Sequence, residues 1–275
     1  MVWRAMKMIQ LDFSGKTAYI TGGAGFIGEG IASAFAEGGA NIAIADMNQE
    51  WMDQARERIT SKYGVTVRTY PLNISIEDDV TRVTDQVFQD FGRMDIFSQV
   101  ASPGPSKVGD VGPFYNVPMS AAKTLVETNL YGTAYCVRSV LKYMLEQKSG
   151  KILLVASISG RYGLEDFSWY GATKAAMIHL TQSIARGHNR EGINCNAICP
   201  GVVLSPLLRG RFAVLAEQQG RTAQEVEQEF VGGWCPQGEA QTPEDMGYAA
   251  AFLCSDQARH INGQTLNVCG AARVN

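Results

Sequence analysis

The chain has 275 residues, of which 45 % are hydrophobic and 19 % charged, and its formal net charge is −3. These values are ordinary for a globular protein with a sizeable core, and the lack of a basic run argues against nucleic acid as a partner. No run of eighteen apolar residues and no apolar leader segment occur, so we expect no membrane span and a cytoplasmic location.

Short apolar runs alternate with segments of helical periodicity along the chain. Strands are predicted at residues 17–21, 41–45, 65–70, 95–100, 151–156, 193–199 and 265–268. Helices are predicted at 26–37, 50–62, from a cap at Ser75 to about 91, at 119–147, at 168–190 and from a cap at Thr242 onward. The alternation, without a linker, predicts a single α/β domain over residues 1–275. We expect a doubly wound Rossmann-type fold with a mainly parallel seven-stranded sheet and helices on both faces.

A glycine-rich turn follows the first predicted strand and opens the first helix. Residues 21–28 read Thr-Gly-Gly-Ala-Gly-Phe-Ile-Gly. Glycines lack a Cβ, so their backbone N–H groups can approach a pyrophosphate closely at the start of a helix. We therefore predict dinucleotide binding by Gly22, Gly25, Phe26, Ile27 and Gly28.

An acidic residue, Asp46, ends the second predicted strand and is followed by Met47. A carboxylate there can accept hydrogen bonds from both adenosine ribose hydroxyls and would repel a 2′-phosphate. No Lys or Arg lies in the glycine turn or directly after Asp46, so NAD is predicted over NADP. The simpler alternative is a solvated acid at a strand end.

A tyrosine and a lysine, Tyr170 and Lys174, lie four residues apart on the helix after the fifth strand, which places them on one face. A nearby ammonium is expected to lower the pKa of the phenol toward neutrality and make it a competent general base. Ser157, with Ser159 two residues on, offers a hydroxyl to hold a substrate oxygen. Taken alone, such a pair also fits an exposed helical face.

The cysteines and histidines predict no metal site. The six cysteines and three histidines are scattered, and no Cys-x-x-Cys pair occurs. Cys195 and Cys199 share one face of an apolar run and are interpreted as small buried side chains.

Together these features resemble the compact branch of the short-chain dehydrogenase/reductase family over residues 15–270. The resemblance rests on the glycine turn, Asn129 in Asn-Leu-Tyr-Gly, Ser157, Tyr170-x-x-x-Lys174, Pro200-Gly201 and the run Ile-Asn-Gly-Gln-Thr-Leu at 261–266. It implies hydride transfer between NAD and a secondary alcohol or ketone.

The same resemblance implies a role for each residue. Tyr170 would be the acid/base, Ser157 would orient the substrate, Lys174 would bind the nicotinamide ribose, and Asn129 would hold a relay water. Further cofactor contacts are implied for Asn73, Ile74 and Ala101 on the adenosine side and for Pro200, Gly201 and Val203 beside the nicotinamide. A homodimer or homotetramer built on the helices that hold Asn129 and Tyr170 is expected.

The sequence departs from the family pattern in four places. The glycine spacing is typical of the longer, sugar-nucleotide branch. Residues 99–102 read Gln-Val-Ala-Ser in place of Asn-Asn-Ala-Gly, which is expected to weaken cofactor affinity without loss of a catalytic atom. Asn73 stands where an Asp is usual, and residues 269–271 read Cys-Gly-Ala in place of Asp-Gly-Gly.

Two segments are predicted to shape the substrate pocket: a Gly- and Pro-rich loop at 102–119 and a lid at 203–238. In the lid, Leu207, Leu208, Phe212 and Leu215 either cover an apolar substrate or form the buried face of a lid helix.

Several substrates and functions stay open. The run at 219–228 looks like that of polyol and sugar-alcohol dehydrogenases, and hydroxysteroid or other cyclic-alcohol oxidation is the close alternative. A sugar-nucleotide epimerase would need a larger substrate domain than the roughly eighty residues after the catalytic helix provide. A non-enzymatic NAD-binding protein would be expected to lack Tyr170, Lys174 or Ser157.

Overall fold

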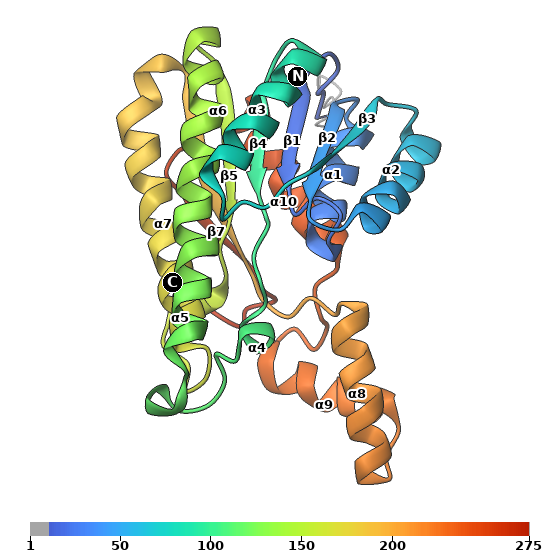
Figure 1. Ribbon diagram of the computed structural model, residues 1–275. Helices are drawn as coiled ribbons and strands as arrows, with labels where there is room; N and C mark the ends of the chain where they lie inside the picture. Colours follow the sequence, from blue (N-terminus) through green and yellow to red (C-terminus); the bar gives the residue numbers. More distant parts are fainter. Residues whose placement is uncertain (1–10, 275) are drawn as a thin grey trace, which may run out of the picture.

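A computed structural model describes residues 11–274, apart from the side chain of Leu207. Its centre is a seven-stranded parallel sheet in the order β3-β2-β1-β4-β5-β6-β7 (Figure 1). The strands are β1 (Thr17–Thr21), β2 (Asn41–Asp46), β3 (Val67–Pro71), β4 (Ile96–Gln99), β5 (Gly150–Val155), β6 (Ile193–Pro200) and β7 (Thr265–Val268). The order reverses between β1 and β4, and such a reversal opens a crevice at the carboxyl ends of the strands.

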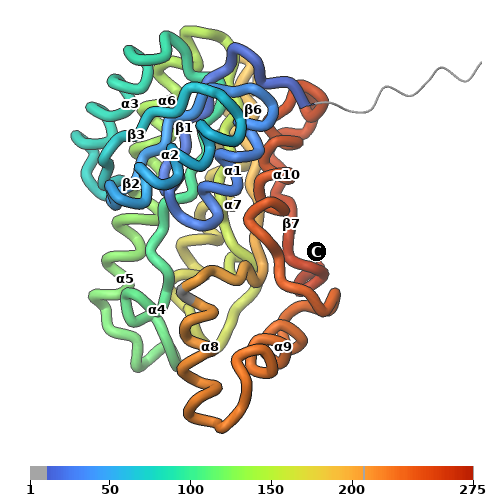
Figure 2. Tube along the Cα trace, turned by 90° about the vertical axis from the view of Figure 1, so that its right-hand side faces the viewer, coloured from blue at the N-terminus to red at the C-terminus, as the bar shows by residue number. Residues whose placement is uncertain are grey.

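Helices cover both faces of the sheet, which confirms the predicted fold class (Figure 2). One layer holds α1 (Phe26–Glu37), α2 (Gln49–Tyr63) and α10 (Pro243–Cys254); the other holds α3 (Glu77–Phe91), α6 (Thr133–Gln147) and α7 (Ser168–His188). Side chains alternate along each strand, so Tyr19 packs in the α3–α6–α7 layer and Ile20 in the α1–α2–α10 layer.

Helices α1 and α10 cross closely because glycines line their contact. A Cβ on Gly30 would lie 2.3 Å from the carbonyl oxygen of Pro243, and one on Gly247 would lie 2.4 Å from that of Gly30. The predicted cap at Thr242 is present as a capping box with Asp245. This contact anchors α1, the helix that follows the glycine turn.

The predicted cap at Ser75 is wrong. Helix α3 begins at Glu77 after Ile76, and the hydroxyl of Ser75 donates instead to Oδ1 of Asn73 at 2.8 Å. The backbone N–H of Asn73 donates to the Asp79 carboxylate at 2.9 Å. The Ser75 hydroxyl is therefore engaged in a local turn around Asn73 and does not cap the helix.

The long helix predicted at 119–147 contains a π-helical segment. It consists of α5 (Met119–Leu125), the π-helix Val126–Gly132, and α6. The hydroxyl of Thr133 donates to the carbonyl oxygen of Asn129 at 2.6 Å, and a Cβ on Gly132 would lie 2.8 Å from the carbonyl oxygen of Ile74. Such segments mark functional sites in many helices, and this one contains Asn129.

Two helices, α8 (Pro206–Gln219) and α9 (Ala223–Trp234), project below the sheet and pack on each other (Figure 1). Phe212 is buried there with its ring centroid 5.1 Å from that of Phe230, and Leu208 packs on the same cluster. Leu215 is 40 % exposed, and the side chain of Leu207 lies outside the described residues. Phe212 thus belongs to the buried face of the lid helix.

Over residues 11–274, no helix is both long enough and apolar enough to cross a bilayer.

Candidate active site

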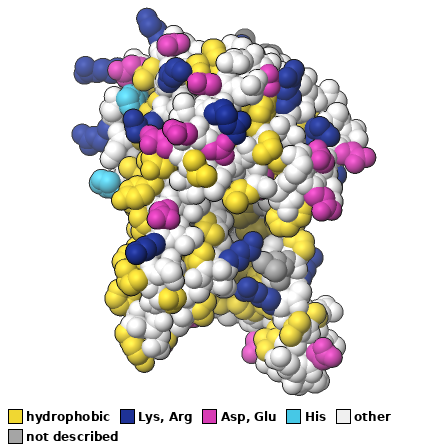
Figure 3. All heavy atoms as spheres, viewed as in Figure 1, with side chains coloured by type: hydrophobic (Ala, Val, Ile, Leu, Met, Phe, Trp, Pro, Cys, Tyr) yellow, Lys and Arg dark blue, Asp and Glu magenta, His cyan; other side chains and the backbone are white. Residues whose placement is uncertain are grey.

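The predicted site segments meet at the carboxyl edge of the sheet. In the strand register Thr21 aligns with Ala45 and Gln99, and Val155 aligns with Ile198. The segments that follow these strand ends therefore share one edge. The surface is hollowed between this edge and the α8–α9 pair (Figure 3).

The glycine turn is packed so tightly that it leaves no room for a side chain at Gly22, Gly23 or Gly28; a Cβ on Gly23 would lie 2.9 Å from the carbonyl oxygen of Ile20. Gly22 has φ +65°, and a Cβ there would lie 2.6 Å from the backbone nitrogen of Ala101. A Cβ on Gly28 would lie 2.0 Å from the carbonyl oxygen of Gly22. Gly25 caps α1 without a side-chain hydrogen bond, while the side chain of Phe26 is 40 % exposed. First-turn N–H groups of α1 remain as donors, which fits a pyrophosphate.

We expect Gly28→Ala to weaken NADH binding at least about tenfold, because the new Cβ displaces the carbonyl of Gly22 and reshapes the turn. Gly187→Ala, near the end of α7, is the control: no atom lies within 4 Å of a Cβ there, and the residue is outside the predicted cofactor site. Titration of each folded variant with NADH, followed by fluorescence, measures the effect. Equal affinities in the two variants would contradict this account of the turn.

The carboxylate of Asp46 is held at the end of β2. Its Oδ1 accepts from the backbone N–H of Met47 at 2.8 Å and of Asn48 at 3.2 Å. The side chain of Met47 is 74 % exposed and carries no charge. The acid is thus oriented by its own backbone and leaves its second oxygen for another donor.

On the predicted adenosine side, the backbone is ordered by local bonds. Oδ1 of Asn73 accepts from both the N–H and the hydroxyl of Ser75. Ile74 is buried, and the N–H of Ala101 donates to the carbonyl of Thr21 at 3.0 Å. The side-chain oxygen of Asn73 thus stabilises the turn. Cofactor contacts by Asn73, Ile74 and Ala101 remain predictions.

Gln99, one of the departures, is fully buried and hydrogen-bonded. It accepts from the Thr21 hydroxyl and donates to the carbonyl of Ala101 at 3.0 Å and to the Thr133 hydroxyl at 3.2 Å. The amide therefore joins β1, β4 and α6 in a satisfied network.

Tyr170 and Lys174 lie on one face of α7, as predicted. Nζ of Lys174 lies 5.5 Å from the centroid of the Tyr170 ring, and the phenol is hydrogen-bonded to Ser157. Ser157 follows β5, and its Oγ accepts from the N–H of Ser159 at 3.1 Å. The structure therefore brings together Ser157, Tyr170 and Lys174, with Ser157 rather than Ser159 bonded to the phenol.

Two glycines absent from the sequence-based site allow this approach. A Cβ on Gly160 would lie 2.7 Å from the backbone of Lys174, and one on Gly171 would lie 2.7 Å from the carbonyl oxygen of Ser159. The turn after β5 thus rests directly on the backbone of α7. The available signal in the sequence was Gly171 directly after Tyr170 and Gly160 three residues after Ser157.

Burial dominates the electrostatics of the pair. Lys174 is 2 % exposed, its Nζ donates to the carbonyl of Val155 at 2.8 Å, and burial lowers its pKa to about 8. Burial raises the pKa of Tyr170 to about 12, although the hydrogen bond to Ser157 opposes the rise. The expected lowering of the phenol pKa toward neutrality is therefore not produced by these residues alone. The phenol is protonated at neutral pH and is ready to act as an acid.

Asn129 connects the loop after β4 to the catalytic helix. Its Oδ1 accepts from the hydroxyl of Ser102 at 2.8 Å, and its Nδ2 donates to the hydroxyl of Thr173 at 3.0 Å. Thr173 in turn donates to the carbonyl of Tyr170 at 2.9 Å. Both polar atoms of this amide are therefore engaged, and a relay-water role for Asn129 stays a prediction.

Beyond β6, packing again requires a glycine. A Cβ on Gly201, directly after Pro200, would lie 2.6 Å from Oε1 of Gln241 and 2.8 Å from the Cβ of Cys269. Val203 pairs with Gln241 in a short parallel bridge. The predicted nicotinamide-side segment is thus packed against Gln241, which precedes α10, and Cys269, which follows β7.

The chain is similar to a large set of proteins with related chemistry. Residues 22–271 match the family model described as enoyl-(acyl carrier protein) reductase. A 3β-hydroxysteroid dehydrogenase of Eggerthella lenta is 32 % identical over 94 % of each chain. NAD⁺-bound xylitol dehydrogenase is 27 % identical with a TM-score of 0.85, covering 94 % of this chain and 99 % of its own. L-sorbose reductase of Gluconobacter frateurii, complexed with NADPH and L-sorbose, is 25 % identical with a TM-score of 0.91, covering 97 % and 100 %.

Proposed function

Because this chain belongs to the short-chain dehydrogenase/reductase family, we propose that it transfers hydride between NAD(H) and a secondary alcohol or ketone. The observation that carries the proposal is the cluster of Tyr170, Ser157 and Lys174 at the sheet edge that also holds the glycine turn. The bound nicotinamide would accept or supply the hydride. The protein positions the substrate and exchanges a proton with its oxygen.

Each residue of the cluster has a separate task in the proposed reaction. Ser157 holds the substrate oxygen beside the phenol, to which it is already hydrogen-bonded. In the reductive direction Tyr170, protonated at neutral pH, donates its proton to the developing alkoxide, and in the oxidative direction the phenolate form of Tyr170 takes the proton from the alcohol hydroxyl. Lys174 is the cation next to the ring, and its charge stabilises the phenolate that forms.

NAD is proposed over NADP because of Asp46. Its carboxylate is oriented by two backbone N–H groups at the end of β2, where it can accept from ribose hydroxyls and repel a 2′-phosphate. The similar structures include both an NAD⁺ and an NADPH complex. The proposed preference for NAD therefore rests on Asp46 of this chain.

We expect Asp46→Ala to reduce the ratio of kcat/KM for NAD to that for NADP by about tenfold, because one hydrogen bond to a charged group contributes about 1.5–3 kcal/mol. Asp53→Ala, at a solvated acid on α2, is the control and should leave the ratio unchanged. Steady-state rates with each cofactor give the ratio. A wild-type enzyme that prefers NADP would overturn the assignment.

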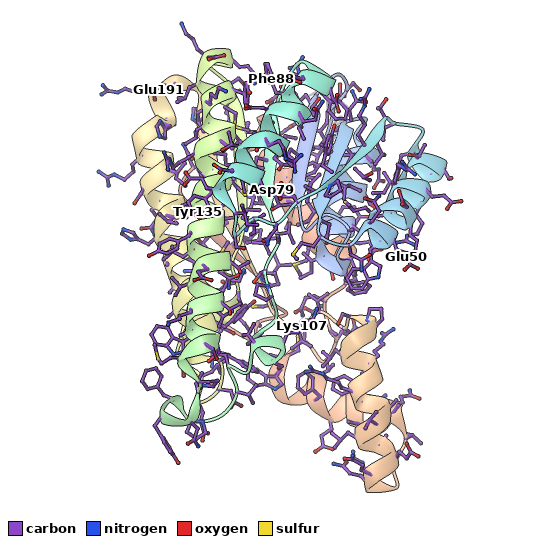
Figure 4. All side chains as sticks on the ribbon, viewed as in Figure 1. Glu50, Asp79, Phe88, Lys107, Tyr135 and Glu191 are labelled. Carbon is purple, nitrogen blue, oxygen red and sulfur yellow. The ribbon has the colours of Figure 1, made fainter. Side chains whose placement is uncertain are left out.

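A polyol or sugar alcohol is the proposed substrate class, with a hydroxysteroid or other cyclic alcohol as the alternative. Phe212 is buried against α9 and does not line the hollow. Lys107, on α4 (Pro105–Val108), is exposed and lies between the sheet edge and the α8–α9 pair (Figure 4). This cation beside the hollow can contact substrate hydroxyls, which supports a substrate with several of them.

The proposal is tested by NAD reduction with a panel of xylitol, sorbitol, cyclohexanol and a 3β-hydroxysteroid. Saturable turnover that is fastest with a polyol is expected. Fastest turnover with the steroid would select the alternative, and no turnover with any alcohol, or with the matching ketones and NADH, would contradict the function. The epimerase alternative has little support, because β6 and β7 complete the sheet and α10 packs on it rather than building a substrate domain.

A further inference from the structure

The first turn of the catalytic helix is capped from outside the helix. The carboxylate of Asp110, in the loop predicted to shape the substrate pocket, accepts from the N–H of Tyr170 at 2.7 Å and of Trp169 at 3.4 Å. The residue at the N-cap position, Phe167, has φ +65° and provides no side-chain cap. The first N–H groups of a helix lack partners within it, so Asp110 satisfies two that would otherwise be unpaired.

Asp110 is a buried charge whose compensation comes from this helix end. It is 0 % exposed, and over residues 11–274 it forms no ion pair. A carboxylate is stabilised at a helix N-terminus by the N–H groups and the helix dipole together. Removal of the carboxylate would leave the part-buried N–H of Tyr170 without its acceptor.

Further contacts fasten the same loop to α7. At its start, Ser102 reaches Thr173 through Asn129. Further along, the N–H of Gly112 donates to the Asp166 carboxylate at 2.5 Å. The loop is thus held to α7 at several points, but only the contact made by Asp110 falls directly on the catalytic tyrosine.

We propose that Asp110 is a positioning residue for Tyr170, a role that rests on the proposed function. Its carboxylate fixes the backbone of Tyr170 and thereby the position of the phenol against Ser157. Without this cap the first turn of α7 frays, and the phenol loses its alignment with the substrate oxygen. Misplacement by about 1 Å costs up to about a hundredfold in rate.

The test compares Asp110→Ala with Asp166→Ala, which removes a carboxylate from the same loop junction without touching Tyr170. Asp110→Ala should lower kcat about 10- to 100-fold and leave the affinity for NADH, measured by fluorescence, within about twofold. Asp110→Asn keeps one acceptor oxygen and should recover part of the rate. Asp166→Ala should act on the KM for the alcohol and leave kcat within about threefold.

Hydrogen exchange provides a readout that does not depend on turnover. In Asp110→Ala the amides of the peptide covering residues 167–172 should exchange at least about tenfold faster, whereas Asp166→Ala should leave them unchanged. Unchanged exchange, or a kcat within twofold of wild type, would overturn the proposal. If Asp110→Ala does not fold, Asp110→Asn decides by the same two readouts. A wild-type protein that turns over no alcohol would contradict the proposed function, and the exchange data would then decide the cap separately.

Discussion

Tyr170→Phe is expected to bind NADH as tightly as the wild-type protein and to turn over the alcohol about 10²- to 10⁴-fold more slowly, the usual contribution of a general acid/base. The substitution removes one oxygen from a partly buried ring and leaves the packing in place. The proton then has no carrier, because the aliphatic hydroxyl of Ser157 is a much weaker acid than a phenol. Paired fluorescence titration and steady-state rates separate binding from turnover.

A second tyrosine provides the control. Tyr162 lies near the same end of α7, where the guanidinium of Arg273 stacks 3.3 Å from its ring centroid. Tyr162→Phe keeps that stack and should retain most of the activity. A Tyr170→Phe variant that keeps more than about a tenth of the wild-type rate would exclude the acid/base role.

The parts of the molecule that depend on local pattern were predictable from the sequence. The strands and helices follow hydrophobic periodicity, and the glycine turn is read directly from residues without a Cβ between a strand and a helix. The i, i+4 spacing of Tyr170 and Lys174 was enough to place them on one face. The confirmed family resemblance depended on these local features.

The remaining parts depend on contacts between distant segments. Nothing around Asp110 in the sequence indicates that its carboxylate reaches Tyr170, sixty residues away. The π-helical segment at Asn129 also depends on a distant contact, the carbonyl of Ile74 against Gly132. Burial of Tyr170 raises the pKa of its phenol where a lowering was expected, because desolvation depends on the whole packed environment.

Lys174 is expected to lower the free energy of unfolding even though it is needed for turnover. Burial lowers its pKa from 10.5 to about 8, which corresponds to a destabilisation of about 3 kcal/mol when the lysine is charged in both the folded and unfolded states. The hydrogen bond to the Val155 carbonyl does not abolish this cost. Lys174→Met fills a similar volume without a charge, and should therefore unfold at higher urea concentration at pH 7 while losing turnover.

The stability gain of Lys174→Met is expected to depend on pH. Because the folded-state pKa lies below the unfolded-state value, the unfolded protein binds more protons between about pH 8 and 10.5. The penalty is full below about pH 8 and disappears as the pH rises through 10.5, so the advantage of Lys174→Met should shrink over that window. At pH 7 a net gain of about 1–2 kcal/mol remains after the lost hydrogen bond is subtracted.

Lys151→Met is the matched control. Lys151 is the second residue of β5, the strand whose Val155 carbonyl accepts from Lys174. Burial also lowers the pKa of Lys151, and its ammonium donates to Asn194 rather than to the site. It should keep full activity, whereas Lys174→Met should lose it. Urea unfolding at pH 7 and pH 10, paired with rate measurements, tests both arms. A Lys174→Met protein less stable than wild type at pH 7 would show that the buried ammonium stabilises the fold, and that its hydrogen bond to β5 outweighs the desolvation cost.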